Sequence, residues 1–423
     1  MSQPLTGEAT RALSPEDAEE YQRRLAAARE LMARHGFDAL AVSDFSSAQP
    51  RYSRFFSGFH IPAARSPLVA IVPSSDEPVL VVPPGIRRSW SNAAHARSWI
   101  PDIVSTYVDD ADWEAPDVHH WGLNTQPGSD VVDALRRLGL DSARIGIAGT
   151  WADIEETKAQ LPLARFEPTL VEDADGRAQD QLEPLIGVNS SWEIKKLEAA
   201  HSASDVITRA FVEAACAGAT INEASIQAKA AGRRAGADEE IRLYGTPYVE
   251  PWSFWDFGLA DRDERFQREK LYFVEVAGSS VDGYGVQSGR CFVVGSPTTA
   301  QVRFAKIMQR SIEALFANIA PGKTGAEMWE AGLTAVTEPG LEPWAEFGHI
   351  VGYQQWTASP SRIHFRPKDQ NTIHEGQALA AHVCLTDKIE GFGGFIGDTI
   401  LVEEGGGWRH LSSNPSPYEL VTC

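Results

Sequence analysis

Carboxylates and histidines lie in or beside strand-like segments in the second half of this 423-residue chain. Glu275 and His382 stand within apolar runs, Asp398 directly precedes another, and His349 follows a phenylalanine and a glycine. An imidazole can accept a proton near neutrality, and a buried carboxyl group needs a partner. These residues are therefore candidates for acid–base chemistry, for anchoring a cationic substrate or for holding a metal ion.

The elements that must position these residues begin after residue 187. Residues 189–193 pair a capping residue with the start of a long helix, and apolar positions continue along one side of it. Further along we expect strands at 271–276, 378–385 and 399–402 and a helix at 301–317.

The first half of the chain alternates helix and strand signals. A capped helix begins at Ser14 and ends at Gly36, and a second amphipathic segment covers 131–138. Buried strands are expected at 39–42, 68–72, 79–82 and 145–148. We therefore predict an α/β domain over residues 1–187 and a second domain over residues 188–423.

Composition restricts the classes of partner. The formal charge is 38 − 58 = −20, and no Lys/Arg-rich run stands out, so we expect neither nucleic acid nor a membrane surface as a partner. No stretch approaches membrane-spanning length and the N-terminus lacks a basic-then-apolar leader, so we predict a cytoplasmic protein. Four scattered cysteines are expected to be structural residues in a reducing compartment: Cys216, Cys291, Cys384 and Cys423.

The second half resembles the catalytic domain of the creatinase/prolidase, or pita-bread, superfamily. The resemblance depends on the order and spacing of several stretches: 189–197, 273–278, 283–290, 319–324, 347–352, 375–382 and 397–402. It implies a C-terminal α+β pita-bread domain. The first half resembles, more loosely, the N-terminal domain of the same superfamily, with the stretch 52–59 at its aromatic-glycine segment.

The resemblance also implies where the family's metal ligands would stand. Metal-dependent members hold two divalent ions with two aspartates, one histidine and two glutamates. Here these positions are occupied, in order, by Glu275, Gln287, His349, His382 and Gly397, and the spacing from Glu275 to Gln287 is one residue longer than usual. With one carboxylate in place of four, two adjacent cations would repel each other without compensation. We therefore predict no bound metal pair, no cofactor and no dinuclear metallopeptidase activity.

The metal-independent creatinase and ectoine hydrolase members are the nearest in character. By this resemblance we predict a hydrolase, or lyase, that cleaves a C–N bond of a small nitrogenous or zwitterionic metabolite. Glu275 would anchor a cationic substrate and His349 would act as the base. His382 would donate a proton to the leaving nitrogen or orient His349, while His364 and His374 are expected to be exposed to solvent.

Further substrate contacts follow from the same resemblance. The stretch around Tyr52 and Arg54 reaches into the neighbouring subunit's site in creatinase-like dimers, which predicts a homodimer. An aromatic wall at Trp252, Trp255 and Phe257 would suit a flat or cationic ligand. The predicted substrate-binding residues are Tyr52, Arg54, Trp255, Tyr284, Gln287 and Asp398.

Two other functions stay open from the sequence. The chain could be a non-catalytic pita-bread binding protein, since the family's ligands are lost. It could also be an enzyme with one zinc or iron ion held by His349, His382 and Glu275, because two imidazoles and a carboxylate are a common mononuclear set. The sequence identifies neither the substrate nor the choice between hydrolase and lyase.

Overall fold

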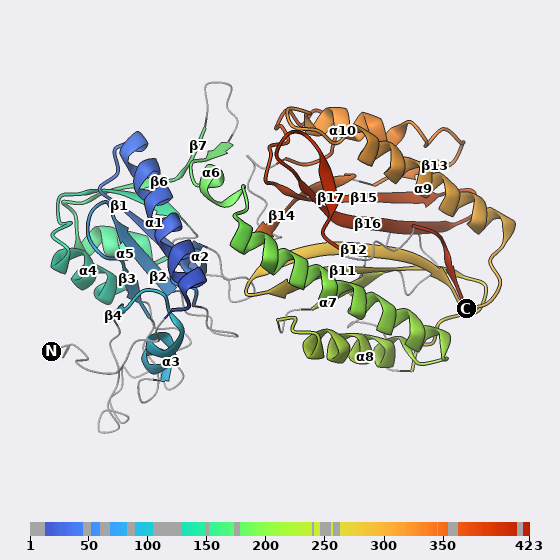
Figure 1. Ribbon diagram of the computed structural model, residues 1–423, viewed down its shortest axis with the longest axis horizontal. Helices are drawn as coiled ribbons and strands as arrows, with labels where there is room; N and C mark the ends of the chain where they lie inside the picture. Colours follow the sequence, from blue (N-terminus) through green and yellow to red (C-terminus); the bar gives the residue numbers. More distant parts are fainter. Residues whose placement is uncertain are drawn as a thin grey trace. The chain divides into compact units, whose positions relative to one another are not determined.

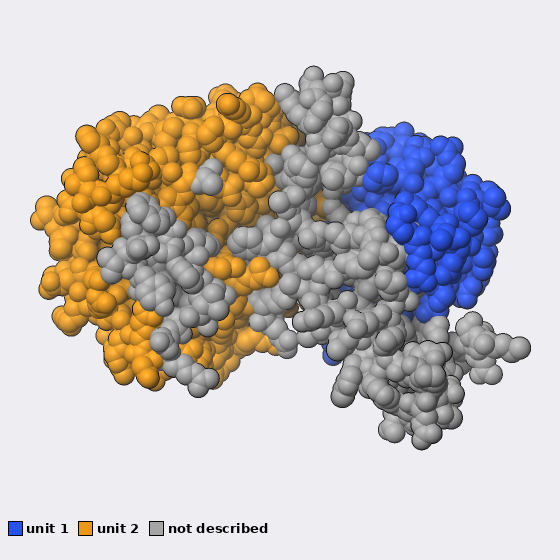
Figure 2. Space-filling model, turned by 180° about the vertical axis from the view of Figure 1, so that it is seen from behind, with its two compact units in different colours: residues 1–185 blue, residues 186–423 orange. Residues whose placement is uncertain are grey.

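The computed structural model divides the chain into two compact units, residues 1–185 and 186–423, which Figure 2 colours separately. The predicted boundary at residue 187 differs from this division by two residues. The structure describes residues 13–44, 52–59, 68–82, 89–104, 128–148, 152–172, 178–238, 241–245, 255–256, 263–344, 346–353, 363–412 and 418–423.

Unit 1 is built on a six-stranded sheet of mixed direction with strand order β4-β3-β2-β1-β5-β6. Its strands are β1 (Ala39–Asp44), β2 (Leu68–Pro73), β3 (Val79–Val81), β4 (Asp102–Val104), β5 (Arg144–Ala148) and β6 (Arg165–Pro168), with a separate pair β7 (Leu170–Glu172) and β8 (Ala178–Asp180). Its helices are α1 (Pro15–His35), α2 (Tyr52–Ser57), α3 (Ser89–Arg97), α4 (Gly128–Arg137) and α5 (Ala152–Gln160), and α6 (Glu183–Ile186) lies at the boundary.

Local chemistry fixes α1 as the sequence predicts. Ser14 caps the helix by accepting from the Asp17 backbone N–H, and Gly36 ends it in the left-handed conformation at φ 70°. The buried guanidinium of Arg24 lies over the Phe55 ring, 4.1 Å from its centroid, and donates to the Phe55 carbonyl. Glu20, one turn earlier, balances that charge at 2.7 Å.

Unit 2 is built on a ten-stranded sheet, most of it antiparallel, with helices packed against it. The strands are β9 (Arg242–Gly245), β10 (Trp255–Asp256), β11 (Leu271–Val281), β12 (Tyr284–Val293), β13 (Leu341–Pro343), β14 (Gly348–Tyr353), β15 (Ala378–Asp387), β16 (Phe392–Val402), β17 (Trp408–His410) and β18 (Val421–Thr422). The helices are α7 (Ser191–Cys216), α8 (Ile221–Arg234), α9 (Thr299–Asn318) and α10 (Gly325–Leu333).

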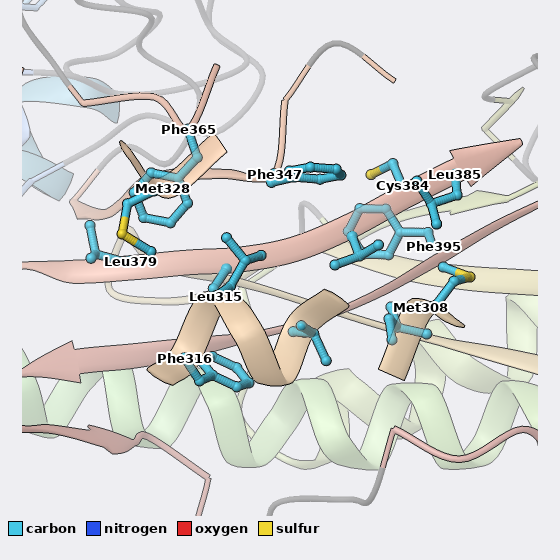
Figure 3. Packing of buried hydrophobic residues seen from close by; sticks show 14 of the residues in the cluster. Met308, Leu315, Phe316, Met328, Phe347, Phe365, Leu379, Cys384, Leu385 and Phe395 are labelled. Atoms are coloured by element: carbon cyan, nitrogen blue, oxygen red, sulfur yellow. The ribbon is translucent and has the colours of Figure 1, made fainter. Parts of the chain in front are cut away.

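The helices cover the sheet in two pairs, as Figure 1 shows. Helix α7 packs on β11 and β12, and α8 packs against α7. Helix α9 packs on β15 and β16, and α10 packs against α9. Figure 3 shows the second of these cores, where Met308 and Leu315 of α9 belong to one buried cluster with Leu379 and Leu385 of β15. Four of these helices begin with a complete capping box, at Ser190, Thr220, Thr298 and Thr324.

The predicted fold class, an α/β domain followed by an α+β domain, is confirmed.

The four cysteines were expected to be structural residues in a reducing compartment. Cys216 and Cys423 instead form a disulfide across 207 residues. Cys291 and Cys384 are free and buried. Sequence spacing could not reveal the bond, since it depends on β18 returning to pair with β12 beside the end of α7.

Within the ranges given above, no helix combines the length and apolar character that a membrane span requires.

Candidate functional site

Strand register brings the predicted catalytic residues to one face of the unit 2 sheet. Glu275 on β11 lies opposite Gly289 on β12, Gly289 lies opposite Gly397 on β16, and Gly397 lies opposite His382 on β15. Directly opposed residues point to the same side of a sheet, so Glu275 and His382 share a face. His349 on β14 opposes a residue two positions before His382 and therefore joins them.

Gln287 shares this face and binds Glu275 directly. Its Nε2 donates to Glu275 Oε1 at 2.5 Å. A register shift between Ala277 and Ser279 places one extra residue in β11, which accounts for the longer spacing and leaves Gln287 on the Glu275 side. The Thr399 hydroxyl accepts from the Gln287 backbone N–H at 3.0 Å and donates to its carbonyl at 2.8 Å, so the strand is held firmly here.

Glu275 is a fully buried carboxyl group. Burial raises its pKa to about 8, although the hydrogen bond from Gln287 acts in the opposite direction. Its Oε2 has no hydrogen-bond partner in the part of the chain that the structure describes. The group is therefore neutral near pH 7 and has a proton to donate, so it can act as an anionic anchor only if a bound cation displaces that proton.

His349 and His382 are buried imidazoles with ring centroids 5.6 Å apart. Burial lowers the pKa of both, to about 3 for His382, whose neighbour His349 adds to the effect. His349 Nδ1 lies 2.9 Å from the Ile350 carbonyl, and an imidazole can only donate to a carbonyl, so its Nε2 keeps a free lone pair. His382 Nδ1 lies 3.3 Å from Cys384 Sγ, and its Nε2 is buried without a partner among the described residues.

Glu346 is the site residue that the sequence did not predict. Its ligand oxygen and one nitrogen each of His349 and His382 lie within 4.8 Å of one another. Burial opposes its ionisation, but a hydrogen bond from His364 at 2.8 Å and the nearby imidazoles outweigh burial and lower its pKa to about 2. The predicted solvent exposure of His364 is wrong. The His364 side chain is partly buried, and its backbone forms an isolated antiparallel β-bridge with His349.

Glu346 lies three residues before His349 in the sequence, and this proximity is the feature of the sequence that could have identified it as a site residue. A carboxylate beside a strand is usually a solvated charge. Only the path of the chain into β14 shows that this one turns toward the histidines. It replaces Glu275 in the mononuclear ligand set that the sequence suggested, since Glu275 is outside the cluster.

The face does not offer the family's five-ligand pattern. A Cβ built on Gly397 would lie 2.5 Å from the Cβ of His382, so no ligand side chain fits at that position. Gln287 contributes an amide already bonded to Glu275. The donors that fit a metal ion are instead the ionised Glu346 and two imidazoles that are unprotonated at neutral pH, a set suited to one divalent ion.

Asp398 and Tyr284 were predicted to bind substrate, and the structure places both side chains away from the Glu275 face. Asp398 follows Gly397 and points to the opposite face, where its carboxylate binds His201 Nε2 and Arg290 Nη2, the latter at 3.0 Å. Tyr284 donates its hydroxyl to Glu193 on α7 at 2.9 Å, within the helix–sheet interface. Successive strand residues alternate between faces, which is the physical reason for both placements.

The other predicted contacts are not tested. The side chains of Tyr52, Trp252, Trp255 and Phe257 lie outside the described parts of the structure. Arg54 is half-buried on α2 in unit 1. The homodimer and the role of this segment in a partner's site stay predictions.

Comparison with known proteins agrees with this architecture. Residues 195–404 match Metallopeptidase family M24. The prolidase from Pyrococcus horikoshii OT3 has a TM-score of 0.68 at 18% identity, over 92% of this chain and 98% of that chain. Dipeptidase PepE from Mycobacterium ulcerans has a TM-score of 0.69 at 19% identity, over 96% and 99%.

A third solved structure has a similar fold. The N-terminal domain of FACT complex subunit SPT16 from Cicer arietinum has a TM-score of 0.64 at 12% identity, over 96% of this chain and 99% of that chain. No curated protein sequence matches the chain. At such identities the structures show a shared fold alone. The chain is thus similar to Metallopeptidase family M24 over residues 195–404 and shares the pita-bread fold of these structures.

Proposed function

We propose that this protein is a hydrolase that cleaves a C–N bond of a small nitrogenous or zwitterionic molecule with one divalent metal ion, not two. The observation that carries the proposal is the cluster of Glu346, His349 and His382, with ligand atoms within 4.8 Å of one another. The Nε2 of His382, buried without a partner in the described ranges, supports it, because a buried polar atom without a partner is costly.

The residues of this face would take two roles, metal binding and proton donation. Glu346, His349 and His382 would hold the ion, which when bound would polarise the scissile group and acidify a water molecule. Glu275 is the candidate general acid, because burial keeps it protonated and its Oε2 is free among the described residues to donate to the departing nitrogen. Gln287 fixes the other carboxyl oxygen and so orients that proton.

Charge supports one ion in preference to two. Among the described residues of this face, Glu346 is the carboxylate that is ionised near pH 7, since Glu275 is neutral there. Two adjacent divalent cations would bring four positive charges against one anion. A second ion would therefore lose its hydration without adequate replacement.

Metal stoichiometry tests the proposal directly. The full chain, purified without chelator, should contain about one equivalent of zinc or iron by elemental analysis. Glu346→Gln and His382→Ala should lower that content at least about tenfold, since each removes a ligand. The matched control Glu342→Gln changes an exposed glutamate on β13, and it should retain the metal. Two equivalents in the wild type would refute the proposal.

Activity is the second arm of the test. Release of amine or ammonia from a panel of small amides, amidines and dipeptides should require Glu275. The Glu275→Gln variant should therefore lose this hydrolytic activity while retaining the metal. A protein that holds one ion but hydrolyses no member of the panel would point to the binding-protein alternative.

Metal-independent hydrolysis is the second candidate, and the existing hydrogen bonds favour it. Glu346 already accepts from His364, so its charge has a partner without an ion, while His349 donates Nδ1 to the Ile350 carbonyl and keeps Nε2 free to accept a proton. In that case the free Nε2 of His349 would be the base. Full turnover in protein shown to be free of metal, abolished by His349→Ala, would support this candidate.

A further inference from the structure

Unit 2 contains a cavity on the face of its sheet opposite to Glu275. It has a volume of about 460 Å³ and lies between one side of α7 and the C-terminal tail, residues 418–423, with β12 as its floor. Ser288 and Arg290 of β12 border it. They alternate with Gln287 and Gly289, which face Glu275, so this cavity is separate from the candidate site. Its size is that of a small-molecule pocket.

The floor of this cavity is a charge network that is already balanced. Arg290 donates Nη1 to the carbonyls of Gly289 and Gly397, both at 2.7 Å, and Nη2 to Asp398. Asp398 also binds His201, and these cationic partners outweigh burial and lower the Asp398 pKa to about 2. Arg290 is therefore committed to groups of the protein itself and is a poor receptor for an anion.

The walls carry an excess of negative charge around an apolar strip. Arg290 and His201 balance Asp398 and Asp205, since His201 Nδ1 also lies 3.6 Å from Asp205. The remaining lining charges are Glu213 and Glu419 against Arg209, which gives 1 − 2 = −1. Val212, Leu420 and Val421 form the strip.

We propose that this cavity binds a small amine with an apolar body, the ammonium group toward the carboxylates of Glu213 and Glu419 and the body against Val212. Charge-assisted hydrogen bonds and burial of apolar surface would both contribute to binding. The proposal is independent of the function proposed for the Glu275 face.

The Cys216–Cys423 disulfide holds one wall of this cavity in place. Cys216 ends α7 three residues after Glu213, and Cys423 follows Val421 by two residues. The tail is also paired to β12, with Val421 opposite Phe292. Because three residues of the tail line the cavity, reduction of the disulfide should loosen that wall and weaken binding.

Calorimetric titration of the oxidised full chain with n-hexylamine tests the proposal, with 1-hexanol and hexanoate as probes of equal chain length. We expect one hexylamine per chain at this cavity, with the alcohol and the carboxylate binding at least about tenfold more weakly, since they lack the charge-assisted bonds. No hexylamine binding, or equal binding of the three probes, would overturn the proposal.

Variants locate the binding. Glu213→Gln with Glu419→Gln should weaken hexylamine binding about tenfold, and Val212→Trp, which fills the cavity, should abolish it. The matched control Glu313→Gln, an exposed glutamate on α9, should change nothing. Unchanged affinity in the double variant would refute this assignment even if Val212→Trp failed to fold.

The two proposals fail separately. Glu275→Gln should leave hexylamine binding unchanged, and loss of binding in that variant would assign the amine to the other face. Dithiothreitol, which is oxidised as it reduces the disulfide to two thiols, should weaken binding several-fold, as should Cys423→Ser. Equal affinity in the oxidised and reduced proteins would refute the role of the disulfide.

Discussion

Replacement of Glu275 by glutamine should stabilise the protein, and by an amount that grows with pH. The native carboxyl has a pKa of about 8 and the ordinary value is 4.5. Between these values the unfolded chain releases a proton that the folded chain retains. The free energy of unfolding therefore falls as pH rises from 4.5 to about 8, and it stops changing through this group above that range.

The magnitude follows from the size of the shift. At pH 7 the unfolded carboxyl lies 7 − 4.5 = 2.5 pH units above its pKa, which corresponds to about 3 kcal/mol of lost stability. An amide does not titrate, and its oxygen can still accept from Gln287 Nε2. Glu275→Gln should thus match the wild type near pH 4.5 and exceed it by about 3 kcal/mol at pH 7.

Urea unfolding of chelator-treated protein at pH 5, 6, 7 and 8, followed by tryptophan fluorescence, measures this difference. Glu313→Gln provides a matched control at an exposed position, where a small effect is expected. A difference between Glu275→Gln and wild type that stays constant from pH 5 to 8 would refute the reasoning. So would a variant less stable than the wild type at pH 8.

Three other substitutions have definite expected outcomes. Asp398→Asn should lower the free energy of unfolding by about 3–5 kcal/mol in a urea titration, because it removes the buried anion that His201 and Arg290 share. Gly397→Ala should cost about 1–3 kcal/mol and reduce metal content, since its Cβ would lie 2.5 Å from the Cβ of His382. Cys423→Ser should lower the urea midpoint under oxidising conditions, by about 2–4 kcal/mol in free energy, and should match the wild type under reducing conditions.

The sequence was informative where local rules decide the structure. Caps at Ser14 and Ser190 predicted helix starts that the structure contains. The strands containing Glu275 and His382 were also predicted, and their register with β14, which contains His349, brings the three residues to one face. These features depend on short-range spacing and on period-two alternation, both of which can be seen in a single sequence.

The errors arose where distant segments meet. The disulfide joins residues 207 positions apart, and Glu346 becomes a site residue only through the path of the chain before β14. Asp398 is a different kind of error, because alternation from Gly397 already predicts the opposite face. Asp398 was predicted to reach the site because it follows the ligand position Gly397 by one residue. A shift of one residue in a strand, however, reverses the direction of the side chain.

The same alternation explains how one sheet can keep two sets of charges apart. Asp398 and Arg290 face α7 and balance each other, so neither adds charge to the Glu275 face. On that face the two imidazoles and Glu275 are neutral near pH 7, and Glu346 is the anion among the described residues. One carboxylate with two neutral imidazoles is a ligand set for a single divalent cation and leaves a net charge of 2 − 1 = +1, whereas a second divalent cation would leave +3. The charge available on this face, more than the number of ligand positions lost, is therefore the physical reason to expect one ion.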